Sequence, residues 1–331
     1  INITFLSIIF SLYLYEAYLS MSSLSSFELK KKSKIYKIKT GKNYDTRSKF
    51  QVYKELKEKD ENVTVTAPPG VLYVDDLKHS IFPLSGKSYS RTIVCNENGY
   101  YSSYMSDRYG FNNPDYVWDK NEIEYLIIGD SLAYGECVNR PNDIASVLRK
   151  LSNKNVINLG YGSNGPIIEY ATLKEYFPKN TKNIIWLYSE VNDLFDITRE
   201  LKNKTLSKYY NDNDFSQNLI KKQDLIDNIV LDKISSQSKI NNQINYKTAI
   251  IKFVKLNNLR NFISPYEHKP TDEFIELFKK IKKFSNQNNA NIYFVYMPGS
   301  IRYLAVEYDQ YYEEIKQIIK NININIIDVH S

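Results

Sequence analysis

Short apolar runs alternate with amphipathic stretches from about residue 121 to the C-terminus. Five runs have the length and the residue types of strands: 124–129, 155–159, 183–188, 291–297 and 324–328. Two stretches between them, 141–152 and 271–284, place their apolar residues on one helical face. Apolar strands separated by helices indicate a parallel sheet covered by helices on both faces. In such sheets ligands bind at the carboxyl ends of the strands.

The pattern is different before this region. Residues 1–20 are mostly apolar, whereas 21–62 are polar, rich in Lys and Glu, and typical of a helical or extended stalk. Residues 63–120 hold short β-type runs broken by turn signals. We therefore expect a membrane anchor or signal segment over 1–20, a stalk and a small β-rich region over 21–120, and an α/β domain over 121–331.

The third and fourth strand candidates are separated by a long polar insertion, residues 195–270. It can form a helical cap over the strand ends, where substrate choice often resides. It can equally be a solvated excursion. The sequence leaves both interpretations open.

The apolar run at the N-terminus, residues 1–15, is shorter than the roughly 20 residues that span a bilayer. Because the chain begins with Ile1 and not with methionine, we expect that the start of the span is missing. We favour a membrane anchor or an uncleaved signal over a cleaved signal peptide or a buried helix, since no cleavage site is evident near 17–25. The lysines between Lys30 and Lys39 follow this run, and positive charges beside a membrane span tend to lie on the cytoplasmic side. Taken alone, they favour a cytoplasmic location for the rest of the chain.

The formal net charge of +6 raises the question of a nucleic-acid partner. Of the basic residues, 36 are lysines and 8 are arginines. Lysine lacks the bidentate fork with which arginine reads bases and grips phosphates. We interpret the charge as a solvated surface and expect no nucleic-acid partner.

The two cysteines, Cys95 and Cys137, are too few for a disulfide framework and lack the spacing of metal ligands. They are either one bridge or two buried thiols. A bridge would fasten the N-terminal region to the loop beside Ser131, and it would fit an exported protein. We expect neither a metal nor an organic cofactor.

Ser131 follows the first strand candidate, in the segment Ile-Ile-Gly-Asp-Ser, where a helix is about to begin. A helix start favours negative charge and suits a nucleophilic serine, whereas the plainer alternative is a helix-capping serine. The next two strand ends carry the glycine-rich turn 158–166 and the pair Asn192 and Asp193. A hydroxyl, backbone N–H groups and a side-chain amide are the parts that acyl transfer needs.

These segments, in this order, resemble the SGNH (GDSL-type) hydrolases, which are serine esterases and acyltransferases. The resemblance covers about residues 107–331 and implies a flavodoxin-like three-layer α/β/α sandwich with a parallel sheet of about five strands. It implies that Ser131 is the nucleophile and that its own N–H donates to the oxyanion. The other oxyanion donors would be the backbone N–H of Gly162 or Ser163 and the side-chain amide of Asn192.

The segment at 107–115, Asp-Arg-Tyr-Gly-Phe-Asn-Asn-Pro-Asp, is similar to the lead-in of membrane-associated members that act on surface polysaccharides. The resemblance implies an O-acylated carbohydrate or a small ester as the substrate. Together with the apolar N-terminal run, it leads us to expect a membrane-anchored protein. We favour export of the body to the periplasmic side, although the sequence leaves the side of the membrane open.

Two positions depart from the family pattern. Glu190 stands where the third block usually has glycine, and it could crowd the site or alter the turn. Asp328 and His330 are all that represents the final Asp-x-x-His block, which supplies the general base. We interpret His330 as the end of a truncated chain without its base, with Asp328 and His330 as the alternative catalytic pair, and expect His79 and His268 at the surface. The competing function is a catalytically silent domain that binds glycan or a partner protein.

Overall fold

The computed structural model describes residues 2–22, 25–75, 79–190, 193–240, 246–263, 269–299 and 311–329. The chain forms two compact units. The first comprises residues 1–48, 96–100 and 236–268, and the second comprises 49–95, 101–235 and 269–331.

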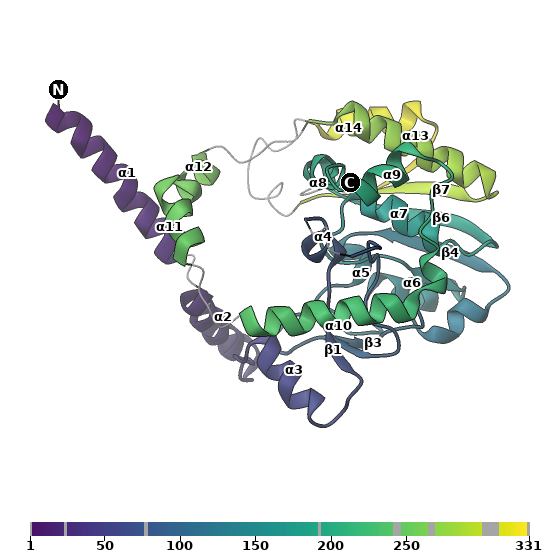
Figure 1. The fold of residues 1–331 in the computed structure, drawn as a ribbon, viewed down its shortest axis with the longest axis horizontal. Helices are drawn as coiled ribbons and strands as arrows, with labels where there is room; N and C mark the ends of the chain where they lie inside the picture. The colour runs from purple at the N-terminus through teal and green to yellow at the C-terminus, as the bar shows by residue number, and fades with distance from the viewer. Residues whose placement is uncertain are drawn as a thin grey trace. The chain divides into compact units, whose positions relative to one another are not determined.

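The second unit is built around a five-stranded sheet in the order β5-β4-β6-β7-β8, in which all neighbours are parallel (Figure 1). The strands are β4 Ile123–Gly129, β5 Val156–Asn158, β6 Thr181–Ser189, β7 Asn291–Met297 and β8 Asn325–Asp328. All five predicted strands are confirmed. The order is that of flavodoxin-like sheets, which bind ligands where the strand order reverses, here between β4 and β6.

Helices cover both faces of this sheet and confirm the predicted three layers. One face packs against three helices: α7 Pro166–Tyr176, α13 Asp272–Gln287 and α14 Tyr312–Asn321. The other face packs against two helices: α5 Ser131–Tyr134 and α6 Ile144–Ser152. Alternate strand residues enter the two cores, so that Trp186 packs against Phe278 of α13 while Leu187 lies in the core beneath α5 and α6.

A small three-stranded sheet in the same unit confirms the β-rich region. Its strands are β1 Val63–Val65, β2 Arg91–Ile93 and β3 Ser103–Met105, with β1 parallel and β3 antiparallel to β2. The accompanying short helices are α3 Lys49–Lys57, α4 Pro69–Leu72 and η1 Asp115–Asp119.

The insertion between β6 and β7 is mostly helical where the structure describes it, and its helices belong to both units. Four of them begin in the second unit: α8 Asp193–Glu200, α9 Lys204–Asn211, η2 Leu219–Lys221 and α10 Gln223–Ile240. Two others lie in the first unit: α11 Tyr246–Val254 and α12 Asn257–Ile263.

The first unit also holds α1 Asn2–Ser22 and α2 Ser25–Thr40. Within α1, the 18 residues Ile3–Ser20 are long and apolar enough to cross a membrane by length and composition. Helices α11 and α12 lie beside the half of α1 that contains Tyr13 and Glu16 (Figure 1). Part of the insertion therefore packs with the N-terminal helix.

Candidate active site

Strand β4 ends at a glycine whose position leaves no room for a side chain. Gly129 has a φ of 152°, and a Cβ atom there would lie 2.9 Å from the carbonyl oxygen of Leu187 on β6. The chain turns directly into α5 because Oδ1 of Asp130 accepts a hydrogen bond from the N–H of Leu132 at 3.1 Å. Ser131 is therefore the half-buried first residue of α5, and its hydroxyl donates to Oδ2 of Asp130 over 3.4 Å.

The turn after β5 is fastened to the helix that begins with Ser131. A Cβ atom at Gly160 would lie 2.4 Å from Cβ of Ala133 and 2.7 Å from the backbone nitrogen of Tyr134, so the close approach requires glycine. Nδ2 of Asn158 donates to the carbonyl of Ala133 at 2.6 Å, and its Oδ1 accepts from the N–H of Gly160 at 2.8 Å. These contacts fix the turn against α5.

The two predicted backbone donors follow in this turn. Ser163 is exposed and has a left-handed backbone with a φ of 62°. A Cβ atom at Gly162 would lie 3.0 Å from Oε2 of Glu136, which is itself exposed. Among the described residues, none accepts a hydrogen bond from the backbone N–H of Gly162 or of Ser163. Their role as oxyanion donors stays a prediction.

Helix α4 also packs against this turn, a contact that the sequence did not predict. A Cβ atom at Gly70 would lie 1.8 Å from the carbonyl oxygen of Ser163, so only glycine allows the approach. The N–H of Ala67 donates to the hydroxyl of Tyr161 at 3.3 Å. The sequence Ala-Pro-Pro-Gly at 67–70 predicts a turn, but it does not predict that this turn contacts the segment with Tyr161 and Ser163.

The third strand end carries the remaining predicted donor. Asn192 lies outside the described residues, between the end of β6 and the start of α8. Oε1 of Glu190 accepts from the hydroxyl of Tyr296 at 2.8 Å, and its Oε2 accepts from the N–H of Gly299 at 2.7 Å. The Glu190 carboxylate therefore joins the end of β6 to the end of β7.

Buried carboxyl groups lie near these strand ends. Glu169 on α7 is 1% exposed, and neither of its carboxyl oxygens has a hydrogen-bond partner in the part of the chain that the structure describes. Burial, together with the charges of Asp193 and Asp130, raises the pKa of Glu169 well above its usual value. Burial and Asp130 raise the pKa of Asp193 too, although its Oδ2 accepts from the N–H of Ser189 at 2.8 Å. Each of the two acids therefore keeps its proton to a higher pH than in an exposed position.

Glu200 on α8 fixes the start of α7. Its Oε1 accepts from the N–H of Gly165 at 2.7 Å, and its Oε2 accepts from the N–H of Ile167 at 2.9 Å. Burial and the charge of Asp196 raise the pKa of Glu200 to about 8, against the lowering effect of these hydrogen bonds. Because α7 begins directly after the turn that contains Ser163, Glu200 also holds the far end of that turn.

The lead-in segment at 107–115 braces the second strand end. Oδ2 of Asp107 accepts from the indole N–H of Trp118 at 2.8 Å and from Nδ2 of Asn113 at 2.9 Å. Nδ2 of Asn113 also donates to the carbonyl of Asn158 at 2.8 Å, and its Oδ1 accepts from the N–H of Asn158 at 2.8 Å. Burial raises the pKa of Asp107 to about 6. The sequence resemblance drew attention to this segment, but it did not predict that Asn113 would hold the end of β5 through Asn158.

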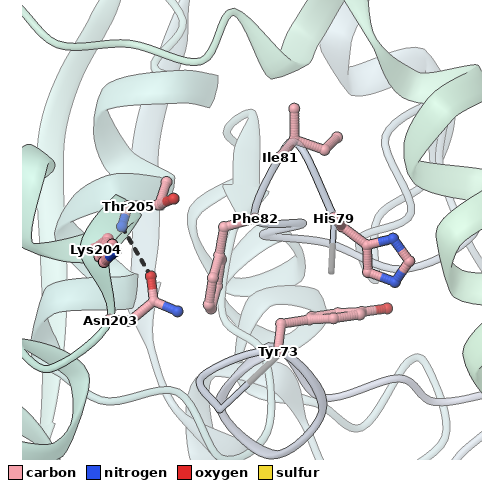
Figure 2. A pocket seen from close by; sticks show the side chains of 7 residues that line it. All are labelled: Tyr73, His79, Ile81, Phe82, Asn203, Lys204 and Thr205. Atoms are coloured by element: carbon pink, nitrogen blue, oxygen red, sulfur yellow. Dashed lines mark hydrogen bonds between the residues drawn. The ribbon is translucent and has the colours of Figure 1, made fainter. Parts of the chain in front are cut away.

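The histidines do not supply a base within the described site. His268 and His330 lie outside the described residues. His79 lines a separate cavity of about 140 Å³, together with Tyr73, Phe82 and the start of α9 (Figure 2). Among the described residues, no group of three His, Cys, Asp or Glu side chains is placed to bind a metal ion.

Asp328 is engaged by the neighbouring helix. Its Oδ2 lies 3.0 Å from Nζ of Lys316 and accepts a hydrogen bond from the hydroxyl of Tyr312, and both residues are on α14. The carboxylate therefore has an ion-pair partner on this face of the sheet. Its catalytic role stays a prediction.

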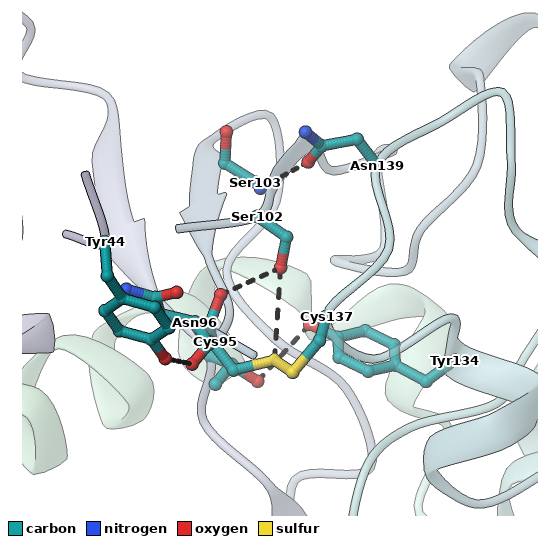
Figure 3. The surroundings of a disulfide bond; sticks show 9 residues. Tyr44, Cys95, Asn96, Ser102, Ser103, Tyr134, Cys137 and Asn139 are labelled. Carbon is teal, nitrogen blue, oxygen red and sulfur yellow. Dashed lines mark hydrogen bonds between the residues drawn. A yellow bond between two sulfur atoms is a disulfide. The ribbon is translucent and has the colours of Figure 1, made fainter. Parts of the chain in front are cut away.

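Cys95 and Cys137 form a disulfide, which decides between the two alternatives (Figure 3). The bridge joins the segment after β2 to the loop after α5, shortly beyond Ser131. Beside it, Oδ1 of Asn139 accepts from the N–H of Ser103 at 2.9 Å (Figure 3). The small sheet is thus attached to the loop that follows the candidate nucleophile.

The chain is similar in structure to a proposed lipolytic protein of the G-D-S-L family from Desulfitobacterium hafniense DCB-2. The TM-score is 0.32 at 13% sequence identity, and the match covers 62% of this chain and 77% of that chain. No family model matches the sequence. No curated protein matches it either. A functional assignment therefore depends on the geometry of the strand ends.

Proposed function

We propose that this chain is a membrane-anchored serine esterase or O-acyltransferase of the SGNH type, which acts on an O-acylated carbohydrate through an acyl-enzyme on Ser131. The observation that carries the proposal is the strand order β5-β4-β6. This order sets the ends of β5 and β6 on the two sides of β4, the strand that leads into Ser131. In sequence, Gly162 and Ser163 follow β5, and Asn192 follows β6.

In the proposed reaction, Oγ of Ser131 attacks the carbonyl carbon of the ester, and a general base takes the hydroxyl proton. The carbonyl oxygen becomes an oxyanion, which accepts hydrogen bonds from the N–H of Ser131, from the turn at Gly162 and Ser163, and from the Asn192 amide. When the intermediate collapses, the alcohol leaves with a proton and the acyl group stays on Ser131. Water or a sugar hydroxyl then accepts the acyl group.

The base is the part of the mechanism that the described residues do not supply. A serine hydroxyl is a weak nucleophile at neutral pH and needs an adjacent base. Lys316 and Tyr312 engage Asp328, and His79 lines a separate cavity. We therefore assign the base to a residue outside the described part of the chain. The same observation favours a second candidate function, a catalytically silent domain that binds glycan or a partner protein at these strand ends.

The proposed location rests on α1 and on the disulfide. Helix α1 is long and apolar enough to cross a membrane, a property that it shares with signal sequences. Oε2 of Glu16 on α1 accepts from the N–H of Leu259 at 2.7 Å, a contact that favours retention of the helix. The Cys95–Cys137 bridge favours export, since disulfides persist in oxidising compartments. We therefore place the body on the periplasmic side.

Substitution of the nucleophile tests the proposal in the natural full-length protein. Ser131→Ala should abolish hydrolysis of p-nitrophenyl acetate and release of acetate from an O-acetylated polysaccharide, with an unchanged melting temperature. Asn192→Ala should lower kcat by about 10²–10³, or roughly 3–4 kcal/mol, because it removes one oxyanion donor. A change confined to KM would mean that Asn192 only binds substrate. If Ser131→Ala retains wild-type hydrolysis, the acyl-enzyme is wrong; if neither form hydrolyses esters but both bind glycan, the silent domain is correct.

A further inference from the structure

Helix α1 carries a buried carboxylate, and the insertion binds it. Glu16 is 0% exposed. Its Oε1 accepts from the backbone N–H and from Nδ2 of Asn258 at 3.1 and 2.9 Å, and its Oε2 accepts from the N–H of Leu259 at 2.7 Å. Nδ2 of Asn258 also donates to Oγ of Ser20 at 2.9 Å. These backbone donors belong to the first turn of α12, where N–H groups lack partners within the helix. Glu16 therefore attaches α12 to α1.

Helix α11 reaches the middle of the apolar span. The hydroxyl of Tyr13 donates to the carbonyl oxygen of Val254 at 2.9 Å, and the rings of Tyr13 and Phe253 are 5.6 Å apart. The apolar span ends at Ser20. With a rise of about 1.5 Å per residue, Tyr13 is about 10 Å from that end. The C-terminal end of α11 therefore lies about 10 Å inside the span, measured along α1.

Helix α11 exposes apolar residues and belongs to a segment whose charged residues are all basic. Ile250, Ile251 and Val254 are 62%, 45% and 58% exposed. The residues 246–263 contain no Asp or Glu, and their charged residues are Lys247, Lys252, Lys255 and Arg260. Helices with an apolar side and basic residues bind at anionic bilayer surfaces, with their apolar side about 5–10 Å deep.

We propose that α11 enters an anionic bilayer beside α1, with Ile250, Ile251 and Val254 among the acyl chains. The inference rests on the proposed anchoring by α1. Because α11 touches α1 at mid-span, the acyl chains that surround α1 must also meet the apolar residues of α11. Glu16 gives a second reason, since a carboxylate at membrane depth needs hydrogen-bond donors, and α12 brings those donors to it. The protein would thus be held by two elements that are distant in sequence.

Fluorescence at Val254 tests this arrangement in the full chain. Val254→Cys is labelled with the polarity-sensitive dye NBD under non-reducing conditions, which keep the native cysteines bridged. The protein is then placed in vesicles of phosphatidylcholine and phosphatidylglycerol. We expect a blue-shifted emission that acyl-chain nitroxide lipids quench strongly. The matched control is Leu151→Cys on α6, a residue 79% exposed in the other unit, which should show neither the shift nor the quenching.

A second variant links the result to Glu16. Glu16→Ala removes the acceptor that holds α12, so the Val254 probe should lose most of its quenching while the protein still floats with the vesicles. A water-like Val254 probe on vesicle-bound wild-type protein would overturn the inference and leave the anchor intact. A blue shift without lipid would identify a second copy of the chain as the cover and would also overturn it. Failure of the protein to float with vesicles would refute the anchor and the inference together, and none of these outcomes depends on ester hydrolysis.

Discussion

The contact between Gly160 and α5 allows a sharp mutational test of the site. A Cβ atom at Gly160 would lie 2.4 Å from Cβ of Ala133 and 2.7 Å from the backbone nitrogen of Tyr134. Carbon atoms in contact are separated by about 3.5–4.0 Å. Neither atom of α5 belongs to a flexible side chain, so Gly160→Ala must move the turn away from the helix by about 1 Å.

This displacement should affect both stability and rate. Overpacking of this kind typically costs about 1–3 kcal/mol, and we expect the free energy of unfolding to fall by that amount. The same turn carries the proposed donors at Gly162 and Ser163. A misplacement of about 1 Å can lower a rate about 100-fold, so kcat for p-nitrophenyl acetate should fall by about that factor.

Urea unfolding and steady-state hydrolysis of the natural full-length protein measure the two effects. Gly162→Ala is the matched control for stability, because the three atoms nearest to its Cβ all belong to the end of the exposed Glu136 side chain. It should change the free energy of unfolding by less than about 0.5 kcal/mol. If Gly160→Ala unfolds like the wild type, the turn is not fixed against α5. If it is destabilised but keeps its kcat, the turn does not supply the oxyanion donors.

Two further predictions concern the buried acid and the last histidine. The pKa of Glu169 is raised in the fold, so its contribution to stability is present below the usual glutamate pKa and is lost as the pH rises through the folded pKa. Glu169→Gln should therefore flatten the decline of the unfolding free energy with pH by up to about 1.4 kcal/mol per pH unit; an unchanged slope in urea titrations would contradict this. His330→Ala should change the esterase rate by less than about twofold, because we assign the base to another residue, whereas a loss of about 10²-fold or more, as for a catalytic base, would make Asp328 and His330 the catalytic pair.

The sheet could be predicted because its strands are buried on both faces and therefore read as continuous apolar runs. The expected strand at 291–297 has the same bounds as β7. The position of Ser131 at the start of a helix after β4 could be predicted for a similar local reason: Gly129 and Asp130, which form the turn into α5, directly precede it in sequence.

The residues that hold the candidate site in place come from segments that are far apart in sequence. A local sequence pattern cannot predict such contacts. Gly70 meets Ser163, and Asn113 holds Asn158, only after the chain has folded. Likewise, the sequence of the insertion did not predict that α12 would donate hydrogen bonds to Glu16. The two cysteines were compatible with either outcome, because their spacing does not determine how close they come.

Covalent trapping at Ser131 tests the central claim most directly. A fluorophosphonate phosphonylates an activated serine with loss of fluoride, and intact-mass measurement and peptide mapping locate the stable covalent adduct. For the natural full-length protein we predict a single adduct, on Ser131, and none after Ser131→Ala. Absence of any adduct, or a single adduct on another residue such as Ser163, would contradict the account.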